Sequence, residues 1–103
     1  MEYANYRDKI AYTQEKASKV VLGETRQGRM TLWCLLPGQH IHPHVHAGDH
    51  YWVVLEGEGR YLAEGQPARE IATGALLIAP AGESHGIENS GSEGLVFVSV
   101  SAG

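Results

Sequence analysis

The chain has 103 residues, of which 43% are hydrophobic and 19% charged, so it is long enough for one folded domain and too apolar to be disordered. Its formal net charge is −4 and its lysines and arginines form no run, which argues against a nucleic-acid partner and against binding to an anionic membrane surface. No apolar stretch is long enough to span a membrane and no secretory signal pattern is present, so we expect a cytoplasmic protein.

The first segment, residues 1–19, is polar and mixed, and its only large apolar anchors are three tyrosines. We expect it to be an N-terminal arm that packs either on the rest of the domain or on a second subunit. The following part, residues 20–101, is divided by glycines and prolines into short apolar runs, which is typical of β-strands joined by turns. The two parts form one predicted domain, residues 1–103.

Alternating and β-branched residues in the second part predict an all-β fold, a sandwich or barrel of roughly eight or nine short strands. Residues 56–59 contain two glycines, which can take positive φ, and predict a tight hairpin that pairs residues 60–63 with residues 50–55. Cys34 is the only cysteine, so no intrachain disulfide is possible, and we expect it in the core. The predicted strands are 19–23, 29–36, the histidine-rich run after residue 38, 50–55, 60–63, 68–72, 75–79, 84–88 and 94–101.

Histidine is concentrated in one part of the sequence, because five of the six histidines lie within residues 40–50. His44 and His46 are two residues apart and therefore project from the same face of a strand. His50 follows after a short polar turn and begins the next strand. If a later strand returns beside these two, it brings His85 to the same point. Imidazole is the most common protein ligand for borderline metals, so we expect these histidines to bind one metal ion.

The histidine run also has a simpler interpretation, a surface tract with metal affinity and no defined site. Such tracts are usually contiguous and terminal, whereas this one is internal and is interrupted by Pro43. His40 and His42 precede that proline. We expect these two histidines to line the entrance of the site or to support it, and not to bind the metal.

Two spaced motifs in the sequence resemble those of the cupin superfamily, and the resemblance covers residues 20–100. The first cupin motif is Gly, five residues, His-x-His, three or four residues, Glu, six residues, Gly. Here it is matched by Gly38, His44, His46 and Gly57, with His50 where the family usually has glutamate. The second motif is Gly, five residues, Pro-x-Gly, two residues, His, three residues, Asn. It is matched by Gly74, Pro80, Gly82, His85 and Asn89.

The resemblance implies a double-stranded β-helix, the jelly-roll barrel, with His44, His46, residue 50 and His85 as ligands of one divalent ion. Some small single-domain cupins similarly have four histidines at this spacing, so His50 is retained as a predicted ligand. Manganese, iron, nickel and zinc are the candidate metals. Four neutral ligands leave the ion its full charge, which makes it a stronger Lewis acid, and octahedral coordination leaves two positions open.

Strand parity predicts the walls of a ligand pocket beside the metal. Trp52 and Val54 share the face of His50, and Ile87 shares the face of His85. Trp33 and Phe97 are further candidates, with the alternative that both are core residues; Met30 or Cys34 replaces Trp33 if the first long strand has the other phase. The predicted pocket residues are therefore Trp52, Trp33, Val54, Ile87 and Phe97.

Such walls favour a small, largely apolar or aromatic organic molecule, and the absence of an evident inward lysine or arginine argues against an anionic sugar. Two classes of function remain open. The first is a metal-dependent enzyme, either a dioxygenase or an isomerase or lyase with the metal as Lewis acid. The second is a non-catalytic cupin that binds or senses a small molecule.

Catalytic acids and bases are poorly marked in the sequence. Tyr51 is expected to face away from His50, and Glu83 lies in a turn, so no general base is identified. Because a chain of this length buries limited surface by itself, we also expect a homodimer.

Overall fold

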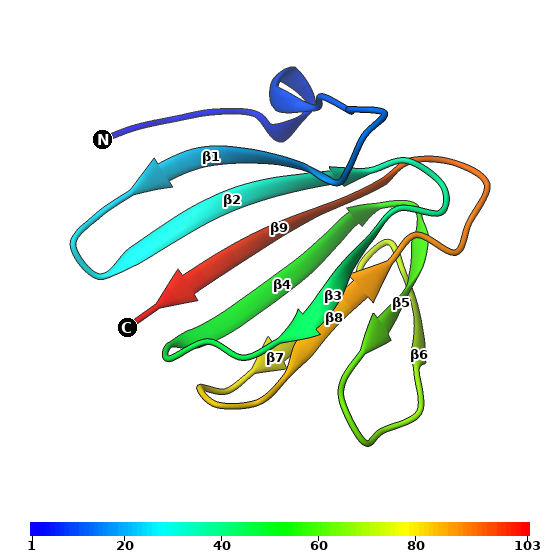
Figure 1. Cartoon of the computed structure of the whole chain (residues 1–103). Helices are drawn as coiled ribbons and strands as arrows, with labels where there is room; N and C mark the ends of the chain where they lie inside the picture. Colours follow the sequence, from blue (N-terminus) through cyan, green and yellow to red (C-terminus); the bar gives the residue numbers. More distant parts are fainter.

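The computed structural model describes residues 1–103 and contains nine strands preceded by a short 3₁₀ helix, η1 (Tyr6–Lys9) (Figure 1). No helix in it is long and apolar enough to cross a membrane. The strands are β1 (Ser18–Glu24), β2 (Gly28–Leu35), β3 (His40–His44), β4 (Asp49–Glu56), β5 (Glu58–Leu62), β6 (Arg69–Ala72), β7 (Leu76–Ala79), β8 (His85–Glu88) and β9 (Leu95–Ala102).

The strands form two antiparallel sheets that face each other, and this confirms the predicted all-β jelly roll. One sheet has five strands in the order β1-β2-β9-β4-β7, and the other has four in the order β3-β8-β5-β6. Non-consecutive strands are neighbours in both sheets, so segments far apart in sequence lie side by side. The histidine strand β3 is thereby paired with β8, which carries the last histidine of the chain.

The chain changes sheets at Gly57, and the hairpin predicted between residues 50–55 and 60–63 is wrong. β4 pairs with β7 and β9, whereas β5 pairs with β6 and β8. Gly57 has a φ of 92°, and an added Cβ would collide with the carbonyl oxygen of Gly94. The glycine therefore does permit a sharp turn, but that turn carries the chain from one layer to the other.

The main core lies between the two sheets, where alternate residues of the facing strands meet. Its buried members are Leu35, Trp52, Val54, Ile71, Ile87, Leu95 and Phe97. Each large apolar side chain removed from water contributes about 1.5–3 kcal/mol. A second cluster, formed by Leu32, Cys34 and Val96, lies on the opposite face of the five-stranded sheet. Cys34 is thus a core residue, and burial raises the pKa of its thiol.

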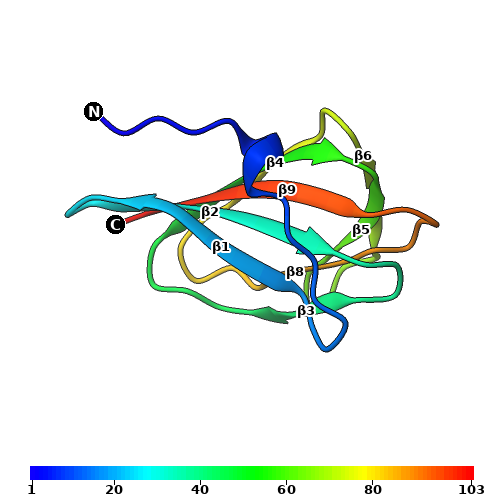
Figure 2. The ribbon, with the colours of Figure 1, turned by 90° about the horizontal axis from the view of Figure 1, so that it is seen from above.

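The N-terminal segment lies against the outer face of the five-stranded sheet (Figures 1 and 2). Tyr6 and Ile10 pack on the second cluster, and the Tyr6 hydroxyl donates a hydrogen bond of 2.9 Å to Glu56 Oε2. Of the two alternatives for this arm, the structure has the one in which it packs on its own domain. Its first residues stay free of the sheet, since Tyr3 is 84% exposed.

A bulge in β3 sets the direction of the first metal-site histidine. Ile41 is paired with Ile87, but His44 is paired with His85, so β3 has one more residue than β8 between these two pairs. The extra residue changes the parity of the strand. As a result Ile41 and His44, which are three residues apart, both lie on the inner face, next to their inward partners on β8.

Gly86 on β8 makes room for this bulge. A Cβ added to Gly86 would lie 2.6 Å from both the Ile41 carbonyl oxygen and the Pro43 nitrogen. Both atoms belong to the backbone, so no side-chain rotation relieves the contact. The close approach of β3 and β8 at this point therefore depends on glycine.

Candidate metal centre

Four histidines meet at one open end of the barrel. They are His44 from β3, His46 from the β3–β4 turn, His50 from β4 and His85 from β8. Centroids of neighbouring rings lie between 4.3 and 5.2 Å apart. Donor nitrogens of three of them, His44, His46 and His85, lie within 4.8 Å of one another, so these three can bind one metal ion.

The ring of His50 stacks on that of His46, with centroids 4.3 Å apart and an interplanar angle of 19°. It stands beside the group of three and is not one of its members. The fourth metal–ligand bond, between His50 and the ion, stays a prediction.

Backbone carbonyls orient two of the rings. His44 Nδ1–H donates to the His42 carbonyl at 2.8 Å, and His85 Nδ1–H donates to the Glu83 carbonyl at 3.1 Å. Because a carbonyl can only accept, the proton is on Nδ1 and the lone pair of Nε2 is free. His85 is 1% exposed and its Nε2 has no partner. A buried nitrogen of this kind costs about 1–3 kcal/mol when unsatisfied, and a metal ion would satisfy it.

The surroundings favour the neutral form of three of the rings. Burial is the main cause that lowers the pKa of His46, His50 and His85. The pKa of His50 falls to about 4, because burial penalises the charged ring and because the neighbouring His46 and His85 repel a second positive charge. Neutral imidazole is the form that binds metals, so at neutral pH few protons compete with an ion for these nitrogens.

The remaining two histidines lie outside the cluster. His40 and His42 are exposed, and their Nε2 atoms are 3.0 Å from each other. Neither lines the cavity above the cluster, so the structure does not place their side chains at its entrance. The backbone of His42 does support the site, since its carbonyl accepts the hydrogen bond from His44. The bulge in β3 separates these two histidines from His44, although all three alternate in sequence.

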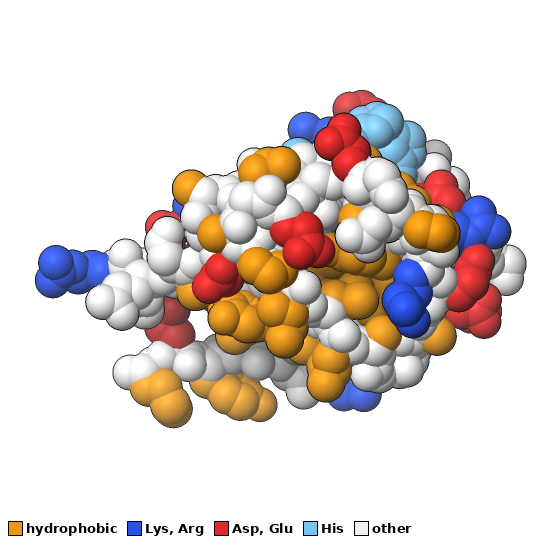
Figure 3. Space-filling model, turned by 90° about the horizontal axis from the view of Figure 1, so that it is seen from below, with side chains coloured by type: hydrophobic (Ala, Val, Ile, Leu, Met, Phe, Trp, Pro, Cys, Tyr) orange, Lys and Arg blue, Asp and Glu red, His pale blue; other side chains and the backbone are white.

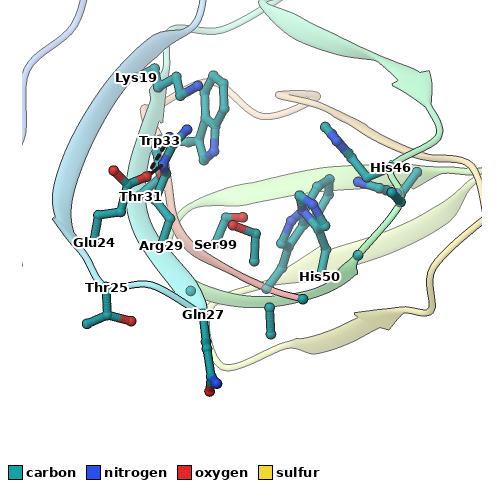
Figure 4. Close-up of a pocket in the computed structure, with 18 of the residues that line it drawn as sticks. Lys19, Glu24, Thr25, Gln27, Arg29, Thr31, Trp33, His46, His50 and Ser99 are labelled. Carbon is teal, nitrogen blue, oxygen red and sulfur yellow. Dashed lines mark hydrogen bonds and ion pairs between the residues drawn. The ribbon is translucent and has the colours of Figure 1, made fainter.

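A cavity of about 520 Å³ opens over the histidines (Figure 4). His46 and His50 lie on one side of it, and Trp33 and Lys19 lie on the other. Trp52 also lines the cavity and meets the His85 ring edge to face, with a centroid distance of 5.4 Å.

The other three predicted pocket residues lie behind the cavity. Val54, Ile87 and Phe97 are at most 1% exposed and belong to the main core. Phe97 is stacked on Trp33 at 6.3 Å and so supports the cavity wall without forming it.

The wall opposite the histidines is polar, and the expectation of no inward lysine or arginine is wrong. Lys19 on β1 is paired with Trp33 on β2, and its Nζ lies 5.7 Å from the centroid of that indole. Arg29 also lines the cavity, and its Nε donates a hydrogen bond of 2.6 Å to Glu24. The sequence shows only that Lys19 and Val20 point to opposite faces of a strand; the packing of Val20 on the outer cluster shows that Lys19 is the one that faces inward.

Residues 31–101 match the model of the cupin domain family, and the chain therefore belongs to that family. In a structural comparison it resembles a conserved protein with a double-stranded β-helix domain from Klebsiella pneumoniae. The two share 31% sequence identity with a TM-score of 0.93, over 99% of this chain and 90% of the other.

Two curated proteins are also similar. Dimethylsulfoniopropionate lyase DddW of Ruegeria pomeroyi is 33% identical over 92 residues, which are 89% of this chain and 54% of that protein. An oxalate-binding protein of Thermotoga maritima is 36% identical over 67 residues, 64% of this chain and 54% of the other. The chain thus spans about half the length of the curated relatives it matches.

Proposed function

We propose that this cupin is a mononuclear metal-dependent enzyme acting on a small organic molecule, in a lyase or isomerase reaction. The observation that carries the proposal is the cluster of three imidazoles that lines an open cavity. A divalent ion held there would act as a Lewis acid, polarising an oxygen of the substrate.

The protein's own residues have separable roles in this proposal. His44, His46 and His85 hold the ion, and backbone carbonyls fix the tautomer of two of them. No carboxylate belongs to this group, so the charge of the ion is not offset by its ligands. The indole of Trp52 packs against His85 and closes the inner end of the cavity.

The similarity to a lyase supports this reaction class. The relative named dimethylsulfoniopropionate lyase aligns with 89% of this chain at 33% identity. The alignment covers only 54% of that protein, so the proposal extends to the class of reaction and not to the substrate of the relative.

A second candidate is a non-catalytic protein that binds a small molecule. It is favoured by the lack of a free carboxylate in the cavity, because the only acidic side chain there, Glu24, is bonded to Arg29. Tyr51 is 41% exposed and lies next to Ile78 on the outer face, so it cannot take that role. The similarity to an oxalate-binding protein agrees with this alternative.

Metal analysis combined with a turnover screen tests both candidate functions, the metal-dependent enzyme and the non-catalytic binding protein. The protein is loaded separately with manganese, iron, nickel or zinc, and metal content is measured in the wild type, His46→Ala and His85→Ala. His42→Ala is the matched control, because its side chain lies outside the cluster. We expect one ion per chain in the wild type and control, and large losses in the other two.

Loaded protein is then incubated with a panel of small organic molecules, with and without oxygen, and products are followed by NMR. Oxygen-independent product formation that is lost in His46→Ala supports the lyase or isomerase. Oxygen consumption would instead indicate a dioxygenase, and saturable binding without product would indicate a binding protein. Full metal occupancy in both alanine variants would contradict the site itself.

A further inference from the structure

We propose that the cavity selects a small organic carboxylate, with Lys19 as its counter-charge on the wall opposite the metal centre. This inference rests on the proposed function only in taking the histidine cluster as the site of the ion. It differs from the sequence-based expectation of an apolar ligand because the lining contains cations that strand parity alone did not reveal.

The first support is the position of Lys19. Its pairing with Trp33 puts both side chains on the inner face, and the ammonium group is held over the indole by a cation–π contact of 5.7 Å. That contact orients the ammonium but leaves its charge intact. Lys19 takes part in none of the three ion pairs of the structure, which join Arg29 to Glu24 and Arg60 to Glu70 and Glu88.

The second support is the charge balance of the cavity. Its lining includes three basic side chains, Lys19, Arg26 and Arg29, but a single acidic one, Glu24. Glu24 is already occupied by Arg29. The whole chain has a formal net charge of −4, so positive charge is concentrated at this site against the general trend of the molecule. A divalent ion would add to this positive field, which favours an anionic ligand.

The third support is the excess of hydrogen-bond donors. The indole nitrogen of Trp52 is buried and has no acceptor, and an indole N–H can only donate. The buried Thr31 and Ser99 also line the cavity, and each hydroxyl can donate a hydrogen bond to a ligand oxygen. A ligand with several acceptor oxygens and few donors fits such a lining, and a carboxylate is the simplest one.

The fourth support is the reach of the lysine. Lys19 lies on one side of the cavity and His46 on the other, so the ammonium faces the histidine cluster across the cavity (Figure 4). A carboxylate that uses an open position of the ion would therefore lie within the field of Lys19 as well. The volume of about 520 Å³ leaves space for a small organic body alongside Trp33.

Calorimetric titration of the manganese-loaded protein tests the proposal. The probe is malonate, and malonamide is its uncharged counterpart with the same carbon skeleton. We expect the wild type to bind malonate at least tenfold more tightly than malonamide. Lys19→Met keeps an unbranched side chain over the indole but removes the charge, and should weaken malonate binding about tenfold or more while leaving malonamide unaffected.

Two further variants make the result specific. Lys19→Arg restores the charge and should recover most of the malonate affinity. Lys16→Met changes the net charge of the chain equally but lies outside the cavity, so its malonate affinity should stay within about twofold of the wild type. Equal affinities for malonate and malonamide in the wild type, or unchanged malonate binding in Lys19→Met, would overturn the inference.

The outcomes are distinguishable from a failure of the proposed function, because metal content is measured on each sample after titration. A wild type that holds no metal would overturn both proposals. A wild type that holds one ion but does not distinguish the carboxylate from the amide would overturn only the role of Lys19.

Discussion

His50 stands where the cupin motif usually has a carboxylate, and burial makes it a poor base. Its pKa of about 4 lies below the usual value for histidine of about 6.5, chiefly because of burial. A glutamate at this point would bring a negative charge to the cluster and would offset the charge of a bound ion. An imidazole there would leave the charge of a bound ion undiminished, in agreement with the cationic wall on the other side of the cavity.

This pKa gives a pH dependence of stability with a defined sign. Between pH about 6.5 and 4 the unfolded chain binds a proton at residue 50 that the folded chain does not, so stability falls as the pH is lowered through that window. We expect the thermal midpoint of the metal-free protein to decrease from pH 7 to pH 4.5, and His50→Gln to reduce that slope. An unchanged slope in the variant would show that other groups cause the acid sensitivity.

The fluorescence of Trp52 can be used to follow metal binding at the same site, since the centroid of its ring is 5.4 Å from that of His85. We expect manganese added to the metal-free protein to quench part of the tryptophan fluorescence, because a paramagnetic ion would lie close to this indole. Trp52→Phe should remove most of the change. If quenching survives in Trp52→Phe and disappears in Trp33→Phe, the indole of Trp33 is the one close to the ion.

At the scale of the strands, the bulge in β3 and Gly86 opposite it together set the direction of His44. The bulge turns His44 inward, and the lack of a side chain at Gly86 lets β8 approach the backbone of β3 at that point. The position of a predicted metal ligand therefore depends on a residue that carries no functional group.

Gly86→Ala tests this dependence. The added Cβ cannot be accommodated without moving β3, so we expect a loss of stability of about 1–3 kcal/mol and reduced metal occupancy. Gly91→Ala is the matched control, because the nearest atom to its Cβ would be the Glu58 Cβ at an ordinary 3.4 Å. Denaturant unfolding and metal content are measured on both. Normal metal binding in Gly86→Ala would mean that the bulge does not position His44.

At the scale of the whole molecule, part of the outer face of the five-stranded sheet is apolar and uncovered. The N-terminal arm covers one part, through Tyr6 and Ile10. Outside that part, Leu76 and Ile78 on β7 are 74% and 66% exposed. Hydrophobic side chains gather on one face of the molecule in Figure 3. Exposed apolar area of this kind marks an interaction surface.

We propose that a second copy of the chain covers this area and forms a homodimer. The face already accepts tyrosine and isoleucine side chains from the arm, and Tyr3 of the same arm is 84% exposed and has no place on its own sheet. Sedimentation equilibrium at micromolar concentration should give a dimer for the wild type and a monomer for Ile78→Lys. Gln66→Lys, which adds the same charge in the β5–β6 turn, should remain dimeric. A monomeric wild type at high micromolar concentration would refute the proposal.

The sequence by itself determined the strands, the family and the approximate position of the metal centre. Residue alternation and turn glycines are local properties, and the histidine spacing is written in two short motifs, so His44, His46 and His85 could be brought together without coordinates. Three features were decided only by the tertiary structure. The change of sheet at Gly57 depends on which strands are neighbours, since β4 lies between β7 and β9 and not beside β5.

The other two features, the bulge and the cationic wall, have the same cause. The phase of His44 is set by its pairing with His85, and the orientation of Lys19 over the cavity is set by its pairing with Trp33. Partners distant in sequence fix the register of each strand, and one extra residue in a strand reverses every later side chain. Local pattern identifies which residues alternate, but only the assembled sheets decide which of them face the ion.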